Sequence, residues 1–474
     1  MKRSSLLLLV GTIVLTILLS SCEETVTPID PGTGGNNSYP GFSGAVKDSS
    51  TNAPIVGASV WLFAQPTEDA TVTSLRAKSP SLRNETSSTI PFDHRYSGTP
   101  LQKVTTDTAG RFVFDTTQFT SNNYIVVVTH PNYSWKYVYN KTSKGLGTLY
   151  TKPVITVPAG QGQTLNWNVK DQDYVVTGSI NPTSITISDG VRVRVNVGSG
   201  ITFLNGGTFT ANSSSEPIRI TVNSDNSTDY MGNIGILTST VTMNNVFISG
   251  GGSGNNPALT LDEAAGSVTK TIISNCNNGM TVRGVKLAAS LTLKGIIVRN
   301  ITTTGINITN SINNSISNCI VYNTNLGVNY TANSSIDFSN CYIEGNTNGY
   351  NATGGQIDLT SSEIVAKNGA AVQLRNPSTA SMDLCELVGK VSLDSDATGT
   401  QVGYISDCNL MGTDAKFVIL ASISYNFLNC YFNGTTNDAG VRSKITIPSG
   451  NNINDLQVLG TVYTKVPNAG LKTN

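Results

Sequence analysis

A four-residue pattern recurs nine times in the second half of the chain, and it constrains the fold more than any other feature. Each copy usually has an apolar residue, two small or polar residues, and then cysteine or a substitute. The fourth positions are Val246, Cys276, Ile296, Cys319, Cys341, Ser362, Cys385, Cys408 and Cys430. They are 30, 20, 23, 22, 21, 23, 23 and 22 residues apart, and the long interval coincides with a glycine-rich segment at 250–256. A self-similar period of this length predicts a solenoid.

Apolar pairs two positions apart precede the pattern in most coils, as expected for the inward side chains of a strand. The pairs are Ile306/Ile308, Val328/Tyr330, Tyr350/Ala352, Val372/Leu374, Val391/Leu393 and Val418/Leu420. A third strand begins just after the pattern, so a coil of about 22 residues holds three short strands and three turns. We therefore predict an all-β chain with a parallel β-helix, whose equivalent strands lie about 4.8 Å apart.

Composition agrees with many short strands, because charged residues are 13% of the chain and glycine occurs 45 times. The formal net charge is zero, so no field draws the protein to nucleic acid, and we expect no such partner. We place the β-helix at 175–460, with cysteine-free first coils at 191–195, 201–203 and 218–222. A tail at 461–474 is expected to cover the open end, since exposed strand edges invite aggregation.

The Ser-Asn-x-x-apolar sequence of these coils resembles the right-handed β-helix repeat of pectate lyases and many bacterial surface proteins. The right-handedness is implied by this resemblance alone. In that family an inward asparagine at one turn stacks into a ladder of amides that bond to one another and to the turn backbone. The residues that fit this ladder are Asn245, Asn275, Asn318, Asn340 and Asn429, with Asp407 as a substitute.

The six cysteines that follow this turn allow two interpretations. Equivalent Cα atoms of neighbouring coils lie within bridging distance, so an oxidising compartment would permit disulfides. However, Cys276 is two coils from Cys319, and at most two neighbouring pairs can close. Val246 and Ile296 occupy the same column, which favours buried, mostly reduced thiols that act as small apolar residues. The β-helix contains no histidine, so no cysteine is expected to be a nucleophile.

The N-terminus is organised as a signal peptide at 1–21, with two basic residues before a short apolar segment at 6–19. The segment ends in Leu-Ser-Ser-Cys at Cys22, which resembles the bacterial lipobox and implies lipidation of Cys22 and attachment to a membrane. The alternative is an ordinary signal peptide or an uncleaved anchor.

A tether rich in Pro, Gly, Thr and Asn follows at 22–40. Glu23, rather than aspartate, follows the cysteine, which favours the outer membrane among bacterial lipoproteins. The Glu23-Glu24 pair also resembles the surface-export signal of Bacteroidetes-like lipoproteins. We expect a lipid-anchored outer-membrane protein, with the periplasmic and outward orientations left open.

Separate alternating strands predict a small β-sandwich at 41–152. Its turn sequences, Gly-Ala-Val-Lys-Asp, Pro-Ile-Val-Gly-Ala, Thr-Asp-Thr-Ala-Gly-Arg-Phe and His-Pro-Asn-Tyr, resemble the carboxypeptidase regulatory-like (transthyretin-like) domain. Members of that family usually act as spacers or display modules. Asp107 and Gly110 suit a tight hairpin turn.

A polar insertion at 64–101 interrupts the sandwich, and we expect it to be a mobile loop. The two histidines of the chain, His94 and His130, lie in this domain without a cysteine or carboxylate cluster around them. Solvated loop histidines are therefore expected rather than metal ligands. A linker at 153–174 leads to the β-helix.

The strand with the apolar pairs also carries outward polar residues, which we name the tentative ligand-binding stripe. They are Asn307, Thr309, Asn329, Thr331, Asn351, Thr353, Gln373, Arg375, Ser392 and Asp394. Amide and hydroxyl groups can hydrogen-bond a glycan. The alternative is that Asn and Thr stack on an exposed strand and keep it soluble without a ligand.

The densest acidic group consists of Asp383, Glu386, Asp394 and Asp396. The first two lie in a different turn from the others, so we predict no catalytic or metal cluster and no cofactor. The β-helix has no Gly-His-Gly motif, which speaks against a hydrolase resembling polygalacturonases. We expect a non-catalytic lipoprotein whose β-helix binds glycan or a surface partner. The alternative is a carbohydrate-active enzyme, a polysaccharide lyase rather than a glycoside hydrolase, with calcium and Arg375 or Lys390 as base.

Overall fold

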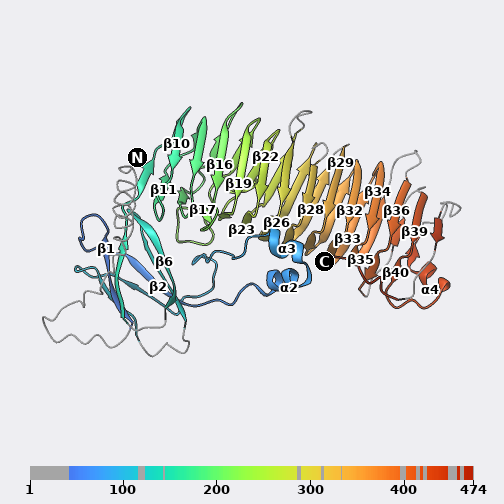
Figure 1. The fold of residues 1–474 in the computed structure, drawn as a ribbon, viewed down its shortest axis with the longest axis horizontal. Coiled ribbons are helices and arrows are strands. Elements are labelled where there is room, and N and C mark those ends of the chain that lie inside the picture. The colour runs from blue at the N-terminus through green and yellow to red at the C-terminus, as the bar shows by residue number, and fades with distance from the viewer. Residues whose placement is uncertain are drawn as a thin grey trace, which may run out of the picture.

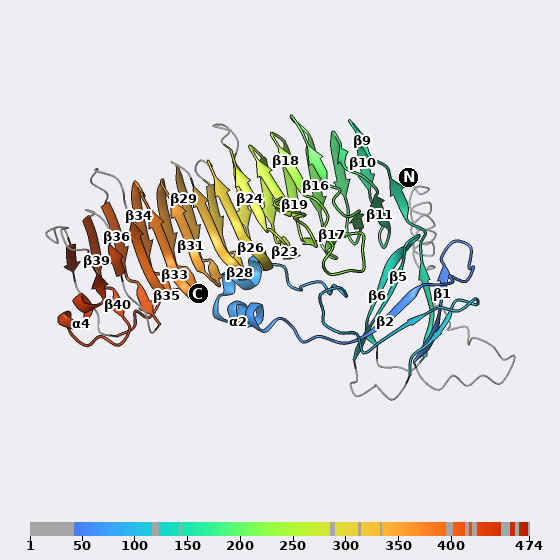
Figure 2. The same ribbon diagram turned by 180° about the vertical axis from the view of Figure 1, so that it is seen from behind.

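The computed structural model describes residues 42–115, 123–141, 145–284, 290–310, 314–331, 334–394, 402–412, 417–419, 424–446, 456–459 and 464–472. It has two parts, a small N-terminal β-sandwich and a long parallel β-solenoid (Figures 1 and 2). Strands make up 55% and helices 5% of the structure, which confirms the all-β class. Cys22, the predicted signal peptide and the tether lie outside the described residues.

The sandwich consists of two small sheets with an apolar core between them. One sheet has the order β4 (Arg111–Val113), β1 (Ser43–Asp48), β7 (Gly145–Thr151). The other has the order β3 (Gln102–Thr105), β2 (Ser59–Ala64), β5 (Tyr124–His130), β6 (Tyr133–Lys141). Val46 of β1 and Val60 and Val126 of the second sheet belong to this core. The predicted hairpin turn is present, because the Asp107 carboxylate accepts backbone hydrogen bonds across it and Gly110 has a φ of 71°.

The solenoid is right-handed, and its coils average about 23 residues, close to the predicted length. Within the described residues, one face is a 13-stranded parallel sheet of β10 (Thr164–Trp167), β13 (Ser184–Ile187), β16 (Thr208–Asn212), β19 (Thr240–Asn244), β22 (Ala265–Thr269), β25 (Leu291–Lys294), β27 (Asn314–Ser317), β29 (Ser335–Ser339), β32 (Gln356–Thr360), β34 (Thr379–Asp383), β36 (Val402–Ser406), β39 (Ser424–Leu428) and β42 (Leu456–Leu459).

The other two strand positions of each described coil form a single 22-stranded parallel sheet. It contains β8 (Ile155–Val157), β9 (Gly160–Gln161), β11 (Asp173–Val176), β12 (Ile180–Asn181), β14 (Arg192–Val195), β15 (Ile201–Phe203), β17 (Ile218–Val222), β18 (Ile234–Leu237), β20 (Val246–Ser249), β21 (Leu259–Asp262), β23 (Ile272–Cys276), β24 (Met280–Arg283), β26 (Ile297–Thr309), β28 (Ile320–Thr331), β30 (Tyr342–Gly345), β31 (Asn348–Thr353), β33 (Glu363–Arg375), β35 (Glu386–Asp394), β37 (Asn409–Met411), β38 (Phe417–Ile419), β40 (Tyr431–Phe432) and β41 (Ile445–Thr446). The long strands β26, β28, β33 and β35 bridge both positions.

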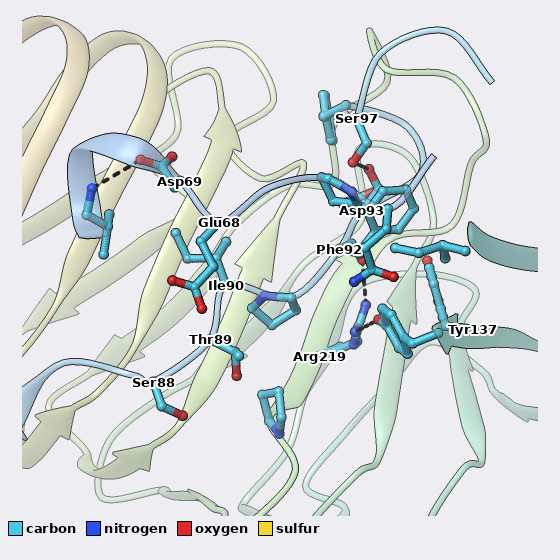
Figure 3. Close-up of a pocket in the computed structure, with 18 of the residues that line it drawn as sticks. Glu68, Asp69, Ser88, Thr89, Ile90, Phe92, Asp93, Ser97, Tyr137 and Arg219 are labelled. Atoms are coloured by element: carbon cyan, nitrogen blue, oxygen red, sulfur yellow. Dashed lines mark hydrogen bonds between the residues drawn. The ribbon is translucent and has the colours of Figure 1, made fainter. Parts of the chain in front are cut away.

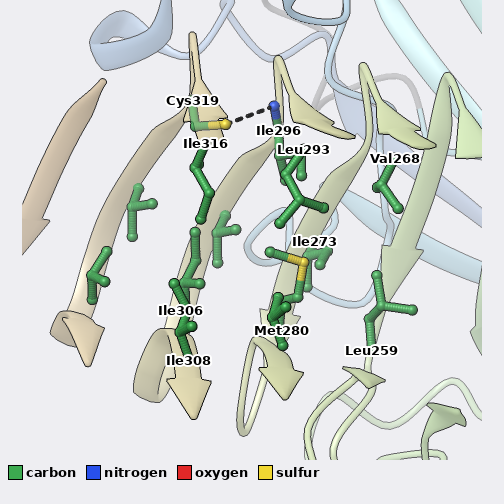
Figure 4. Packing of buried hydrophobic residues seen from close by; sticks show 14 of the residues in the cluster. Leu259, Val268, Ile273, Met280, Leu293, Ile296, Ile306, Ile308, Ile316 and Cys319 are labelled. Carbon is green, nitrogen blue, oxygen red and sulfur yellow. Dashed lines mark hydrogen bonds between the residues drawn. The ribbon is translucent and has the colours of Figure 1, made fainter. Parts of the chain in front are cut away.

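Inward side chains of all three strand positions fill one continuous apolar core along the solenoid. Figure 4 shows this packing, with Leu293, Ile296 and Ile316 on one side and Ile306 and Ile308 facing them. Each coil therefore buries its apolar residues only by stacking on its neighbours, which explains why the pattern must repeat.

The predicted cysteine column exists, but its register at Cys276 is corrected by the strand pairing. Asn244, Thr269 and Lys294 align from coil to coil, so Thr271 occupies the column two residues after Thr269. The column contains Val246, Thr271, Ile296, Cys319, Cys341, Ser362, Cys385, Cys408 and Cys430. The intervals between these positions become 25, 25, 23, 22, 21, 23, 23 and 22, and no long interval remains.

The residue pair Asn275-Cys276 belongs to the next turn of the coil, where Cys276 pairs with Ile301. The asparagine ladder accordingly divides between two turns. Asn340 donates from Nδ2 to Oδ1 of Asn318 at 2.6 Å in the first turn. In the second turn, Asn300 donates to Asn275 at 2.9 Å. The same Asn-Cys dipeptide thus appears at two different corners.

The solenoid begins earlier than predicted, inside the segment 153–174 that was expected to be a linker. Strand β8 pairs with β11, and β10 pairs with β13, so this segment supplies the first coil. The buried Asp173 carboxylate pairs with Arg192 at 2.6 Å and Arg194 at 2.9 Å and accepts the backbone N–H of Trp135 at 2.9 Å. The sandwich therefore rests directly on the first coils.

The insertion within the sandwich is an ordered strap, and the predicted mobile loop is wrong. It forms α2 (Ala70–Lys78) and α3 (Pro80–Glu85), whose N-termini are capped by the Asp69 and Ser79 side chains. Figures 1 and 2 show both helices beside the middle of the solenoid. They bury Val72, Leu75 and Leu82 against an outward apolar column. This column contains Phe247, Ile272, Ile297, Ile320 and Tyr342.

The described part of the C-terminal tail also runs along the solenoid instead of covering its end. Short helix α4 (Asp438–Ser443) follows the last described cysteine coil. Residues 464–472 then return toward the strap, and the backbone of Val466 exchanges two hydrogen bonds with the Asn409 side chain. Leu471 is buried in the same cluster as α2 and α3, and the Lys472 N–H donates to Oδ1 of Asn340 at 2.8 Å. Leu471 therefore gains apolar burial beside the strap.

We expect every described cysteine to be a buried, reduced thiol. All six are unpaired and buried, and burial raises the pKa of Cys276 to about 12. A Cys22→Ser chain should therefore resist Ellman's reagent when native, even at pH 9, and release six thiols after denaturation without reductant. Fewer than six thiols in the denatured chain would show that disulfides form in the column.

Replacing Gly295 by asparagine should displace the strap without breaking the coil. Gly295 has a φ of 66°, which asparagine tolerates, but a Cβ there would lie 2.0 Å from the Glu85 carbonyl oxygen of α3. We expect faster proteolysis or hydrogen exchange in 65–97 of the Gly295→Asn chain and an unchanged far-ultraviolet spectrum. The matched control is Lys270→Asn, which introduces asparagine at the same turn one coil earlier. Equal protection of the strap in both variants would contradict the close approach.

Candidate functional site

The structure brings the tentative ligand-binding stripe together on one face of the solenoid. Strand pairing aligns it in two neighbouring columns. One column contains Asn307, Asn329, Asn351, Gln373 and Ser392, and the other contains Thr309, Thr331, Thr353, Arg375 and Asp394. Sequence reasoning therefore placed these residues in the correct register, although the Asp394 side chain lies outside the described part of the structure.

The amides of the first column form a ladder. Asn351 donates from Nδ2 to Oδ1 of Asn329 at 2.8 Å, and Asn329 donates to Asn307 at the same distance. These amides are half-buried, whereas Thr331 and Arg375 are exposed. A side-chain amide has two N–H groups and two acceptor lone pairs, so each central amide keeps one of each for another partner. The ladder thus offers a fixed, repeated donor and acceptor.

The predicted acidic group does not converge into one site. Asp383 accepts a hydrogen bond from Ser406 on the 13-stranded sheet, and Glu386 pairs with Lys465 of the tail at 2.8 Å on another face. Asp396 lies outside the described residues. Among the residues that the structure describes, no group of three or more His, Cys, Asp or Glu side chains could hold a metal ion.

A second candidate site, which the sequence did not reveal, is a cavity of about 760 Å³ beneath the strap. Its walls are the two limbs of the strap, which lead into α2 and return after α3, together with strands β5 and β6 of the sandwich and outward residues of the solenoid. Figure 3 shows Glu68, Asp69 and Phe92 among the residues that line the cavity, with Arg219 beside Tyr137 of the sandwich. Its volume lies within the range of about 300–1,000 Å³ that is typical of ligand sites.

Buried charges fix the returning limb of the strap on the solenoid. Asp93 pairs with Arg95 at 2.5 Å and accepts the Ser249 hydroxyl at 2.5 Å, while Arg95 also donates to Thr221. Burial opposes ionisation of Asp93, but the Arg95 guanidinium outweighs it and holds the pKa of Asp93 well below its usual range. An ion pair in this environment stays charged near neutral pH and keeps the cavity wall in place.

His94 is a buried contact residue, so the expected solvated histidine is wrong at this position. Its ring nitrogens lie 3.0 Å from the Tyr137 hydroxyl and 3.1 Å from a carboxylate oxygen of Asp225. The Asp225 contact joins the strap to a loop of the solenoid. His130 is only partly buried, and its Nδ1 accepts the backbone N–H of Asn132.

Comparison of the chain with protein-family models, curated proteins and solved structures finds no match. The described helices include none that is both long and apolar enough to span a membrane. The resemblances to lipoproteins and to the carboxypeptidase regulatory-like domain therefore remain predictions from the sequence.

Proposed function

We propose that the protein is a non-catalytic, lipid-anchored lipoprotein of the bacterial outer membrane that binds a polysaccharide along the amide ladder of its solenoid. The observation that supports this function is the in-register column of Asn307, Asn329 and Asn351 beside a column of threonines. Each rung repeats one donor and one acceptor at the strand spacing of about 4.8 Å. A regular polymer with hydroxyl groups can meet several rungs at once.

The other parts of the chain suit display of this face. Cys22 would hold the chain on the membrane, and the tether at 22–40 would separate the folded part from the lipid surface. The sandwich, which resembles a spacer domain, rests directly on the first coils through Asp173. The solenoid would then project as a rigid rod from the membrane or cell surface.

Anchoring through Cys22 should be visible in cell fractionation. We expect the wild-type protein to incorporate labelled palmitate and to sediment with outer membranes, and the Cys22→Ser protein to do neither. Protease treatment of intact cells then distinguishes outward display from a periplasmic position. Palmitate labelling of the Cys22→Ser protein would contradict this anchor.

Binding along the ladder should depend on its central amide. Asn329→Ala removes both ladder bonds of this residue, so we expect at least about fivefold weaker retention in affinity electrophoresis on gels containing plant and bacterial polysaccharides. Asn166→Ala changes an exposed asparagine on the 13-stranded sheet and should leave retention unchanged.

The same polysaccharides also test the absence of catalysis. Incubation with polyuronides and calcium should give no increase in ultraviolet absorbance from unsaturated products. An increase that disappears in Arg375→Ala would support the lyase alternative and contradict a purely binding role.

In the electrophoresis experiment, equal retention of the wild-type and Asn329→Ala chains would contradict the ladder as the binding face.

A further inference from the structure

The cavity beneath the strap has no large net charge. Its lining includes the acidic residues Glu68, Asp69, Asp93, Asp171 and Glu216 and the basic residues Arg76, Arg192, Arg219 and Arg299. Most of these side chains already neutralise one another or a neighbour. Arg299 lies 2.7 Å from Asp69, and Arg192 lies 3.4 Å from Asp171. A strongly charged ligand would therefore gain little from this cavity, whereas a neutral polar ligand finds both donors and acceptors.

An aromatic ring forms part of the wall at the sandwich side. Tyr139 of β6 is 38% exposed, and its ring stacks on Tyr137 with centroids 6.5 Å apart and planes 16° apart. The Tyr139 hydroxyl accepts a hydrogen bond from Arg219 at 2.8 Å, and the Arg219 guanidinium lies over the Tyr137 ring. These contacts fix the orientation of an exposed ring. The face of such a ring attracts the C–H groups of a sugar.

Planar polar groups lie on the solenoid side of the same cavity. Asn300 donates to Asn275, and Arg299 is held between Asp69 and the Ser274 hydroxyl at 3.0 Å. Amides, carboxylates and guanidiniums present paired donors or acceptors, which match neighbouring hydroxyl groups of a sugar ring. An aromatic face and such planar groups across one cavity are the combination that a saccharide requires.

The walls of the cavity are fixed before any ligand enters. The far end of the strap is held by Val72, Leu75 and Leu82, and its returning limb is held by Asp93 and Arg95. A preformed site avoids the entropic cost of ordering loops on binding. This rigidity distinguishes the cavity from a space between mobile segments.

We propose that this cavity binds a neutral oligosaccharide, with Tyr139 as the stacking platform and Asn275, Asn300 and the Asp69–Arg299 pair as hydrogen-bonding groups. It is a second site, separate from the amide ladder, and it stands whether or not the ladder binds a polysaccharide. The ladder would contact an extended polymer, and the cavity would hold a short segment or a chain end.

Calorimetric titration of the mature full chain carrying Cys22→Ser tests this site. The probes are neutral oligosaccharides with cellulose-, mannan- and xylan-type backbones, and oligogalacturonides serve as the charged comparison. We expect at least one neutral series to bind and Tyr139→Ala to weaken its binding by about tenfold. Tyr139→Phe keeps the ring and should remain within about threefold of the wild type. Tyr150→Ala removes another exposed tyrosine of the sandwich and should have no effect.

Several outcomes would overturn the proposal. Binding of oligogalacturonides alone, or of none of the probes, would exclude a neutral saccharide. Equal affinity of the wild-type and Tyr139→Ala chains would exclude this cavity as the site. Loss of binding in Asn329→Ala, but not in Tyr139→Ala, would assign the oligosaccharide to the ladder. Unchanged circular dichroism and thermal unfolding of Tyr139→Ala would show that a loss of affinity is local.

Discussion

A left-handed backbone conformation at one corner of nine successive coils, from Asn245 to Asn429, is the constraint on which this part of the solenoid depends. The corner residues have φ values between 46° and 66°, and they are Asn245, Lys270, Gly295, Asn318, Asn340, Ser361, Leu384, Asp407 and Asn429. This conformation is unfavourable for most L-residues, and Asn, Asp and Gly tolerate it best. It turns the chain between the 13-stranded sheet and the next strand while the ladder stays in register. The recurring asparagine is therefore needed primarily because it tolerates this backbone conformation, and the stacking of its amide is secondary.

This requirement explains how far the sequence could predict the solenoid. Turn residues, inward apolar pairs and a regular interval are local features, so the fold class and the stripe from Asn307 to Arg375 were predictable. The register at Cys276 was not, because a left-handed Asn followed by a small buried residue suits either of two corners. Only the pairing of Thr269 with its neighbours distinguishes them. The first coil was missed because its short strands lack the cysteine and are recognisable only from their partners.

The strap was unpredictable for a different physical reason. Helices α2 and α3 bury only Val72, Leu75 and Leu82. The apolar surface against which these side chains pack belongs to solenoid residues more than 150 positions away in the sequence. The sequence does carry local signals for these helices. Asp69 is a typical N-terminal capping residue. Ser79 is another, and it is followed by proline at the first helical position. Such signals predict a helix start but not its docking surface. The cavity beneath the strap could not be predicted for the same reason, because it forms only when the strap, the sandwich and the solenoid have come together.

The meeting of strap and tail at Asn340 alters how the solenoid can respond to force. Coils of an unsupported solenoid contact only their neighbours and can peel away one at a time from an end. Here the strap contacts coils from Thr221 to Glu363, and the tail contacts coils from Asn409 back to Asn340. A pull on the N-terminal side is therefore shared between the first coil and the middle of the rod. Unfolding from either end must first detach a segment that spans several coils. The coils are therefore held by the strap and the tail as well as by their nearest neighbours.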